Sequence, residues 1–227
     1  MTARWLLAAF AIAALTTFAA PGNPWRIVTL PRIKPAEVAF EGEGEALVVR
    51  IHAQAAAASA VRAWEGPANV QALQWQWKVD HALQAADLSR KDGDDFAARV
   101  YVSFDVPLED LTFATRTRIR IARLLYGDDV PAAAICYVWD NRHAPGFSAW
   151  SAYSSQVRVV VVESGNARAN EWVSERRDVA RDFAAAFGAR HPTTAPRVTG
   201  IAVSSDTDQT GESVTAWFRD VAWSVAP

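Results

Sequence analysis

The chain of 227 residues contains a single cysteine, Cys136, so it has no internal disulfide. A fold without such bridges must be stabilised by its core, and residues 20–227 are long enough to bury most of their apolar surface. The net charge is only −2, with both signs interspersed. This balance gives neither the basic surface that nucleic acid requires nor a polybasic patch for anionic lipid, so we exclude both partners.

Local motifs of the common enzyme classes are also missing. There is no serine-centred nucleophile elbow, HExxH motif, phosphate loop or dinucleotide fingerprint, and the four histidines lack zinc-ligand spacing. Two carboxylates across a groove leave no local signature, so a glycan hydrolase or lyase stays open. The candidate acids are Asp94, Asp95, Asp140, Glu175 and Asp206. Their alternative role is that of solvated or ion-paired surface acids.

One apolar, uncharged run stands near the N-terminus, at residues 5–15 after Arg4. It has the length of a signal-peptide h-region and is short for a membrane span. The small residues that follow predict cleavage after Ala19, which gives a signal peptide at 1–19 and a single domain at 20–227. The alternative is an uncleaved anchor. We expect a periplasmic or secreted monomer with no membrane span after cleavage.

Alternation of apolar and polar residues dominates the rest of the chain. In residues 96–105 the even-numbered positions share an apolar face, whereas Arg99 and Tyr101 share the other. Similar segments, separated by turn-rich stretches, are residues 46–52, 73–79, 133–139, 157–163, 198–204 and 214–225. This pattern predicts an all-β fold with one or two short helices, an antiparallel two-sheet β-sandwich of the jelly-roll or galactose-binding-like type.

Helical signals are few. Residues 178–187 predict a helix that Asp178 caps and Gly188 closes. Its apolar stripe repeats every four residues, at Val179, Phe183 and Phe187. Residues 112–125 fit a helix and a strand equally well. The alanine-rich residues 53–63 predict a short helix or a loose connection.

The last predicted strand changes parity. Ala216 and Phe218 are apolar at even positions, whereas Val221 and Trp223 are apolar at odd ones. A one-residue bulge would restore the alternation, and bulges often re-aim a side chain beside a site. Asp220 is therefore a candidate for metal or ligand contact, the alternative being a solvated charge.

Five segments carry a resemblance to a known family. They are residues 75–79, 91–102, 137–141, 175–188 and 206–211. In order and spacing they resemble the DUF3047 family of bacterial exported proteins across nearly all of the mature chain. The family is one of unknown function, so the resemblance implies no catalytic or binding residues. Its strand pattern is similar to that of jelly-roll carbohydrate-binding modules, an analogy of fold.

Tryptophan is abundant, with ten in the chain. Trp75 and Trp77 are two apart on a predicted strand and share one face. Two adjacent indoles are able to form a platform for a sugar ring. The alternative is that they fill the core, which we favour because Leu73 and Val79 extend the same apolar row.

A second constellation surrounds Arg99. With Tyr101 it should lie on a sheet surface near Asp94 and Asp95, where a guanidinium beside a tyrosine and carboxylates suits a sugar hydroxyl or carboxylate. An ordinary ion pair closing the turn is the alternative. The candidate ligand-binding residues are Asp94, Asp95, Arg99, Tyr101, Trp139, Asp140, Asn141 and Arg176.

The third constellation has oxygen-bearing side chains at alternating positions before Gly211, as in the first half of a calcium loop. Trp217 stands where an EF-hand has its bidentate glutamate, so an EF-hand is excluded. A calcium site completed by distant residues, a polar hairpin loop and the rim of a ligand cleft all stay open. The candidate metal ligands are Asp206, Asp208, Thr210 and Asp220.

These observations favour an exported sandwich that binds carbohydrate or another cell-envelope ligand without catalysis. Such a protein requires no cofactor, and calcium is the one candidate ion. The alternatives are a glycan hydrolase or lyase that uses acidic residues, and an envelope scaffold or protein-interaction domain.

Overall fold

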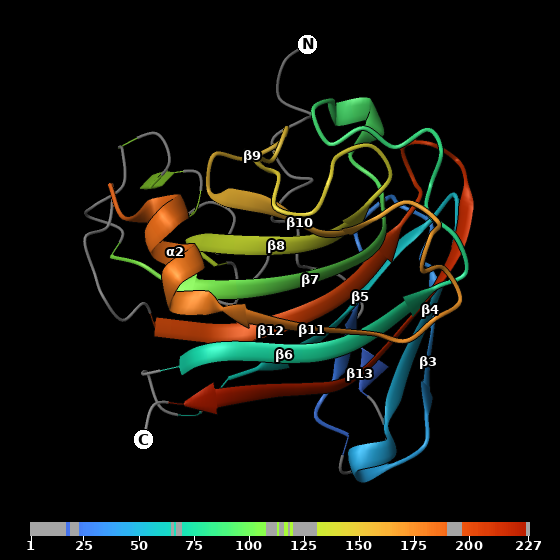
Figure 1. The fold of residues 1–227 in the computed structure, drawn as a ribbon, viewed down its shortest axis with the longest axis horizontal. Helices are drawn as coiled ribbons and strands as arrows, with labels where there is room; N and C mark the ends of the chain where they lie inside the picture. The colour runs from blue at the N-terminus through green and yellow to red at the C-terminus, as the bar shows by residue number, and fades with distance from the viewer. Residues whose placement is uncertain are drawn as a thin grey trace.

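A computed structural model describes residues 17–18, 23–64, 66, 70–107, 113, 116–117, 119, 131–189 and 197–225. Within these residues the chain forms two sheets that face each other (Figure 1). One sheet has eight strands in the order β1-β2-β5-β12-β7-β8-β10-β9, and the other has five in the order β11-β6-β13-β4-β3. The predicted two-sheet β-sandwich is confirmed.

The eight-stranded sheet is antiparallel except where β10 runs parallel to β8. Its strands are β1 (Thr17–Phe18), β2 (Arg26–Val28), β5 (Ala57–Ala63), β7 (Phe96–Asp105), β8 (Ala133–Asp140), β9 (Ser148–Trp150), β10 (Val157–Ser164) and β12 (Arg197–Asp206). The five-stranded sheet is antiparallel throughout. Its strands are β3 (Glu37–Glu41), β4 (Val48–Gln54), β6 (Val70–Val79), β11 (Val173–Asp178) and β13 (Ser213–Val225).

The described elements also include the 3-10 turns η1 (Gly44–Ala46) and η2 (Lys91–Gly93), and the α-helix α2 (Val179–Phe187). The predicted cap of α2 is confirmed, because the Asp178 side chain accepts the Arg181 N–H and the Gly188 N–H bonds to the Ala184 carbonyl. Its apolar stripe packs inward, with Phe183 4.8 Å from Phe104 between ring centroids. Among the described residues, no helix is long and apolar enough to cross a membrane.

The predictions for three other segments are not confirmed. The prediction for 53–63 is wrong, because the second half of this stretch is strand β5, which pairs with β12. Of residues 112–125, only the helical positions 113, 116, 117 and 119 are described, and the rest lie outside the described residues. The predicted signal peptide also lies outside them except for β1, which pairs with β2. Its cleavage stays a prediction.

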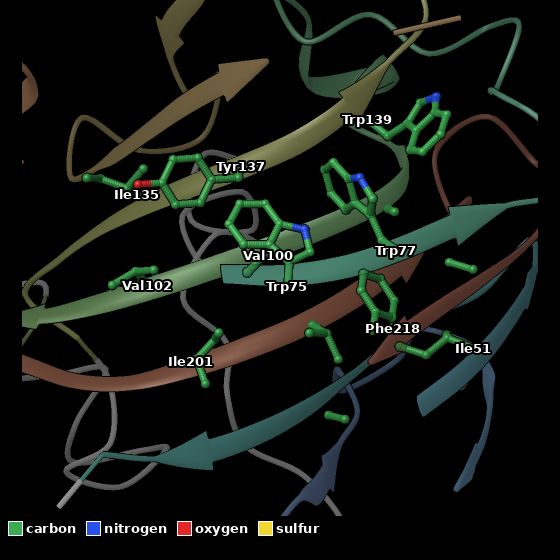
Figure 2. Packing of buried hydrophobic residues seen from close by; sticks show 14 of the residues in the cluster. Ile51, Trp75, Trp77, Val100, Val102, Ile135, Tyr137, Trp139, Ile201 and Phe218 are labelled. Atoms are coloured by element: carbon green, nitrogen blue, oxygen red, sulfur yellow. The ribbon is translucent and has the colours of Figure 1, made fainter. Parts of the chain in front are cut away.

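The core lies between the two sheets (Figure 2). Trp75 and Trp77 on β6 are 1% and 0% exposed and point toward the eight-stranded sheet. The Trp75 ring stacks on Tyr137 at 5.4 Å, and the Trp77 ring lies 5.7 Å from that of Trp139. The core role of the tryptophan pair is thus confirmed, and its role as a sugar platform is wrong.

The predicted bulge in β13 is confirmed. Arg219 pairs with Gln76 and Ala222 with Gln74, so β13 has one more residue than β6 in this interval. Asp220 adopts a φ of 53° there, in the left-handed region. The bulge lets both Phe218 and the residues beyond it keep their apolar side chains against the core.

Candidate functional site

Two predicted sites, far apart in the sequence, meet at one end of the eight-stranded sheet. The start of β7 lies beside the end of β12, with Arg99 opposite Ser204 and Phe96 opposite Asp206. One extra residue on β7 between these pairs turns Phe96 out of the predicted inward row and onto the face of Arg99. We call Asp94, Asp95, Arg99, Asp206 and Asp208 the Arg99 cluster.

Hydrogen bonds fasten this cluster together. Asp95 is fully buried, and its carboxylate accepts the backbone N–H groups of Gln209 and Thr210, the latter at 2.6 Å. Asp206 accepts the Phe96 N–H at 3.0 Å and forms an ion pair with Arg99. The 206–211 loop is thereby tied to the start of β7. It is not a hairpin, because it joins β12 to β13 in the other sheet.

The predicted surface location of Arg99 is wrong. Arg99 is only 8% exposed. Its guanidinium lies 4.9 Å from the ring centroid of Phe96 and 5.7 Å from the ring centroid of the half-buried Tyr101. The physical reason is a second apolar cluster, in which Leu88 and Phe96 pack against outward-facing side chains of β8 and β10. The alternation of apolar and polar residues correctly assigned Arg99 and the core residues to opposite faces of β7, but other side chains cover both faces.

Burial dominates the electrostatics. It raises the pKa of Asp94 to about 6, although the positive charge of Arg99 lowers it, and the Asp94 Oδ1 atom has no hydrogen-bond partner among the described residues. Burial also raises the pKa of Asp208, with the Asp95 charge acting in the same direction. The pKa of Cys136 rises to about 12, so its thiol stays protonated at neutral pH.

Calcium ligation is supported only in part. Oxygens of Asp95, Asp206 and Asp208 lie within 4.8 Å of one another, which suits a hard cation. However, Arg99 already supplies a positive charge to Asp206, and backbone N–H groups occupy Asp95. Thr210 contributes its N–H to this arrangement. Calcium binding stays a prediction.

Asp220 does not join these acids. It lies in the bulge of β13, on the other sheet, where it is exposed and its carboxylate is 3.6 Å from Arg219. Its assignment to the same metal site as Asp206 is therefore wrong.

The candidate ligand-binding residues at the end of β8 stabilise the fold. Trp139 is 1% exposed and donates its indole N–H to the Gly165 carbonyl, so it is not a binding platform. Asp140 is 3% exposed and accepts the N–H of His143 at 2.7 Å. Asn141 donates to the Ala86 carbonyl at 3.0 Å. These contacts anchor neighbouring loops, and burial removes Trp139 and Asp140 from direct contact with a large ligand.

The remaining candidate, Arg176, leads to a surface that the sequence did not predict. Arg176 is exposed on β11, opposite Gln74 of β6. The strands β11, β6 and β13 lie side by side in the five-stranded sheet (Figure 1), so their outward-facing side chains share one face. We call it the aromatic–cationic face. It consists of Gln74, Gln76, Lys78, Trp172, Arg176, Trp217 and Arg219.

Two tryptophans flank a lysine on this face. The Lys78 ammonium lies 4.3 Å from the Trp217 ring centroid and 5.3 Å from that of Trp172. The Arg219 guanidinium lies 4.1 Å from the Trp172 centroid. Both indoles are half-buried, in contrast to the fully buried Trp77 on the other face of β6. Cation–π contacts of this kind hold each ring in a defined orientation at the surface.

A sequence signal for this face existed. Gln74, Gln76 and Lys78 alternate with the core tryptophans of β6, so they had to lie on the opposite side. What the sequence could not show is that β13 pairs Trp217 with Lys78, or that Trp172 joins them from the start of β11. Those neighbours come from strand order, which local patterning does not encode.

One predicted acid has an unusual environment outside the Arg99 cluster. Glu175 lies on β11 opposite Trp75, at the edge of the five-stranded sheet. Burial, and next the charge of Glu163 on β10, raise its pKa to about 7, while Arg168 lowers it. Arg168 also pairs with Glu163 at 3.3 Å. A carboxyl group of the eight-stranded sheet thus acts on one of the five-stranded sheet here.

Comparison with known proteins gives a family and a fold. The sequence matches the family described as "Protein of unknown function (DUF3047)" over residues 23–222. None of the curated proteins matches it. Endoglucanase 3 of Trichoderma harzianum, from glycoside hydrolase family 12, superposes with a TM-score of 0.50 at 7% identity, covering 93% of this chain and 95% of that one.

Two further solved structures are similar. A family 12 xyloglucanase from Bacillus licheniformis has a TM-score of 0.49 at 9% identity, covering 94% of this chain and 100% of that one. The xyloglucanase domain of NopAA from Sinorhizobium fredii, in complex with cellobiose, has a TM-score of 0.48 at 8% identity, covering 92% and 95%. At such identities, the likeness to the endoglucanase shows a shared jelly-roll sandwich and leaves activity undetermined.

Proposed function

Because this chain belongs to the DUF3047 family, which is of unknown function, we propose its role from its own surface: it binds carbohydrate, without catalysis, through the aromatic–cationic face. It does so in the periplasm or outside the cell, where the predicted signal peptide would deliver it. The observation that carries this proposal is the pair of surface indoles, Trp172 and Trp217, on either side of Lys78.

The chemistry of this arrangement suits a sugar. The C–H faces of a pyranose pack on an indole, and nearby amides and cations bond to its hydroxyls, so aromatic contact gives affinity and polar groups give specificity. Gln74 and Gln76 supply amides within the same face. A rigid antiparallel sheet holds these groups in place before the ligand arrives, which lowers the entropic cost of binding.

The test is glycan binding measured by intrinsic tryptophan fluorescence and on a glycan array. We expect Trp217→Ala to weaken binding at least tenfold while leaving the midpoint of thermal unfolding nearly unchanged, because the indole lies at the surface. Phe147→Ala is the matched control. Phe147 is also an exposed aromatic residue, at 41%, but it lies in the loop before β9 of the other sheet. Its loss should leave binding unaffected.

Two results would overturn the proposal. Equal losses for Trp217→Ala and Phe147→Ala would show that the face is not the site. No response to any envelope or plant glycan would sink carbohydrate binding altogether and would favour the scaffold or protein-interaction alternative.

A second candidate function, glycan cleavage, is favoured by the coupled acids Glu163 and Glu175. A carboxylic acid whose pKa is raised to about 7, near a second carboxyl group, is the arrangement that acid–base cleavage of a glycosidic bond uses. New reducing ends, released by the wild-type protein and absent with Glu175→Gln, would identify an enzyme. The same variant should retain binding if the aromatic–cationic face is the site.

A further inference from the structure

We propose that the aromatic–cationic face recognises an acidic polysaccharide, one whose sugars carry carboxylates, as uronates do. This inference rests on the proposed carbohydrate function and names its ligand class. Three cations on the face, Lys78, Arg176 and Arg219, carry it.

The first argument is that these cations have few acidic neighbours. Among the described residues, neither Lys78 nor Arg176 has a carboxylate within 4.0 Å, and Arg219 has only Asp220, at 3.6 Å and in the exposed bulge. The side-chain hydrogen bonds that orient the two arginines are to neutral acceptors. Arg219 donates to the Gln76 amide oxygen at 2.8 and 3.0 Å.

Arg176 is oriented in the same way. It donates to the Gln74 amide oxygen and to the Ser224 hydroxyl, both at 3.4 Å. A guanidinium held by neutral acceptors keeps its full charge and retains donors for a planar, two-oxygen partner, which a carboxylate matches through a bidentate fork.

Arg50 on β4 provides the contrast within the same sheet. It pairs with Glu37 at 2.8 Å and with Glu41 at 3.0 Å, both from β3. Its charge is therefore compensated by two carboxylates, whereas among the described residues Arg219 has one carboxylate within 4.0 Å and Lys78 and Arg176 have none. We would not expect this difference between Arg50 and the cations of the aromatic–cationic face if the arginines served only solubility.

The second argument is spacing. Strand register places the three cations on successive rows of the sheet: Arg176 lies opposite Gln74, Arg219 lies opposite Gln76, and Lys78 lies one row further. Rows of outward side chains are two residues apart, or about 7 Å. The three cations also lie on three neighbouring strands, which are about 4.8 Å apart, so they are spread over the face and fit a polymer with several anionic groups better than a single small anion.

The third argument is the aromatic component. Trp217 lies beside Lys78, and Trp172 lies beside both Lys78 and Arg219, so each indole adjoins a cation. A sugar acid presents an apolar C–H face and a carboxylate on the same ring, and this pairing satisfies both groups at once. A neutral glucan lacks the carboxylate that the arginines would bind.

The experiment compares three ligands by calorimetry at low and high salt: oligogalacturonate, cellohexaose as the neutral glycan, and a sulfated glucan. We expect the wild-type protein to bind oligogalacturonate most tightly, with an affinity that falls as salt is raised. Arg176→Gln and Arg219→Gln should each weaken this binding about tenfold and leave cellohexaose binding unchanged. Arg50→Gln, which removes the same charge from an arginine already paired with two glutamates, should change it less than twofold.

The outcomes separate the two proposals. Binding of cellohexaose but not of oligogalacturonate would overturn the acidic-glycan inference and leave the proposed function standing, whereas failure of both with Trp217 intact would overturn both. Equal or tighter binding of the sulfated glucan, or of a single-stranded oligonucleotide added as a further arm, would show general anion attraction and reject carboxylate recognition. If Arg50→Gln weakened oligogalacturonate binding as much as Arg176→Gln and Arg219→Gln do, the assignment of binding to these two arginines would be rejected as well.

Discussion

The Arg99 cluster and the aromatic–cationic face both place arginine beside aromatic rings, yet they are built in opposite ways. In the cluster, one buried arginine lies among four acids, and backbone N–H groups bond to the carboxylates. On the face, three cations are oriented by neutral amides, a hydroxyl and indole rings. The charged groups of the Arg99 cluster bind other groups of the protein, whereas the cations of the aromatic–cationic face keep hydrogen-bond donors for a ligand.

This difference shows why residue type alone is a poor guide to a binding site. An arginine beside a tyrosine and aspartates, as at Arg99, looks in sequence like a sugar-binding group. Burial and the direction of its bonds assign it to the fold instead, because its partner Asp206 fastens the loop that joins the two sheets. Functional groups concentrate where a rigid scaffold leaves polar atoms unmatched at the surface.

The largest effect should come from breaking the cluster. Arg99→Leu removes the cation that lies among the four acids, so Asp206 would be left as an uncompensated buried charge. Removing one partner of a buried ion pair costs about 3–5 kcal/mol. We expect this loss in the free energy of unfolding, measured by denaturant titration.

The paired control is Arg176→Leu on the face. It removes a surface arginine with no ionic partner among the described residues, so its cost should stay within about 0.5 kcal/mol. Similar stabilities for the two variants would contradict the contrast between the regions.

Much of the fold follows from alternation. The strand predicted at 96–105 matches β7 at both ends, and the parity change in the sequence of β13 correctly predicted its bulge. The prediction for 53–63 failed because a run of alanines gives no alternation of size or polarity. The strand β5 was therefore missed, although Ala57, Ala58 and Ala60 are buried. Strand order and the parallel β8–β10 pair are set by long-range packing, which no local pattern encodes.

The site was harder to predict for a related reason. Proximity of Asp95 to Asp206 depends on β7 lying beside β12, and the bulge in β7 turned Phe96 out of its predicted row. The sequence also placed Lys78 away from the core correctly, but it offered no way to choose Trp172 and Trp217 among ten tryptophans. Parity identifies a face, whereas neighbours across strands must come from the fold.

A smaller change in the free energy of unfolding should depend on pH. The pKa of Asp94 is about 6 in the folded chain, above the ordinary value of 3.8, because it is buried. The folded state then binds the proton more tightly than the unfolded state, so ionised Asp94 destabilises the protein at pH 7, and this penalty is lost as pH falls from about 6 to about 4. Asp94→Asn should therefore be about 2–3 kcal/mol more stable than wild type at pH 7 and nearly equal at pH 4.

The matched variant is Asp92→Asn, two residues earlier and exposed in η2, where its carboxylate pairs with Arg90. It should be no more stable than wild type at pH 7. The difference between each variant and wild type across pH, from chemical denaturation, isolates Asp94 from Asp208 and Glu175, whose raised pKa values act in the same direction. A stability difference for Asp94→Asn that does not change with pH would contradict the assignment.

The smallest effect should be that of calcium on the wild-type protein, and it tests the comparison most directly. If Arg99 already occupies the position of a cation beside Asp206, millimolar calcium should raise the midpoint of thermal unfolding by less than about 1 °C. In Arg99→Leu the same three oxygens, those of Asp95, Asp206 and Asp208, would lack that positive charge, and calcium should recover part of the lost stability in a chelator-sensitive way. Magnesium should recover less, because it demands a tighter octahedral shell. A large, chelator-reversible shift in the wild-type protein would show instead that the cluster binds an ion alongside its arginine, and the two regions would then both be ligand sites.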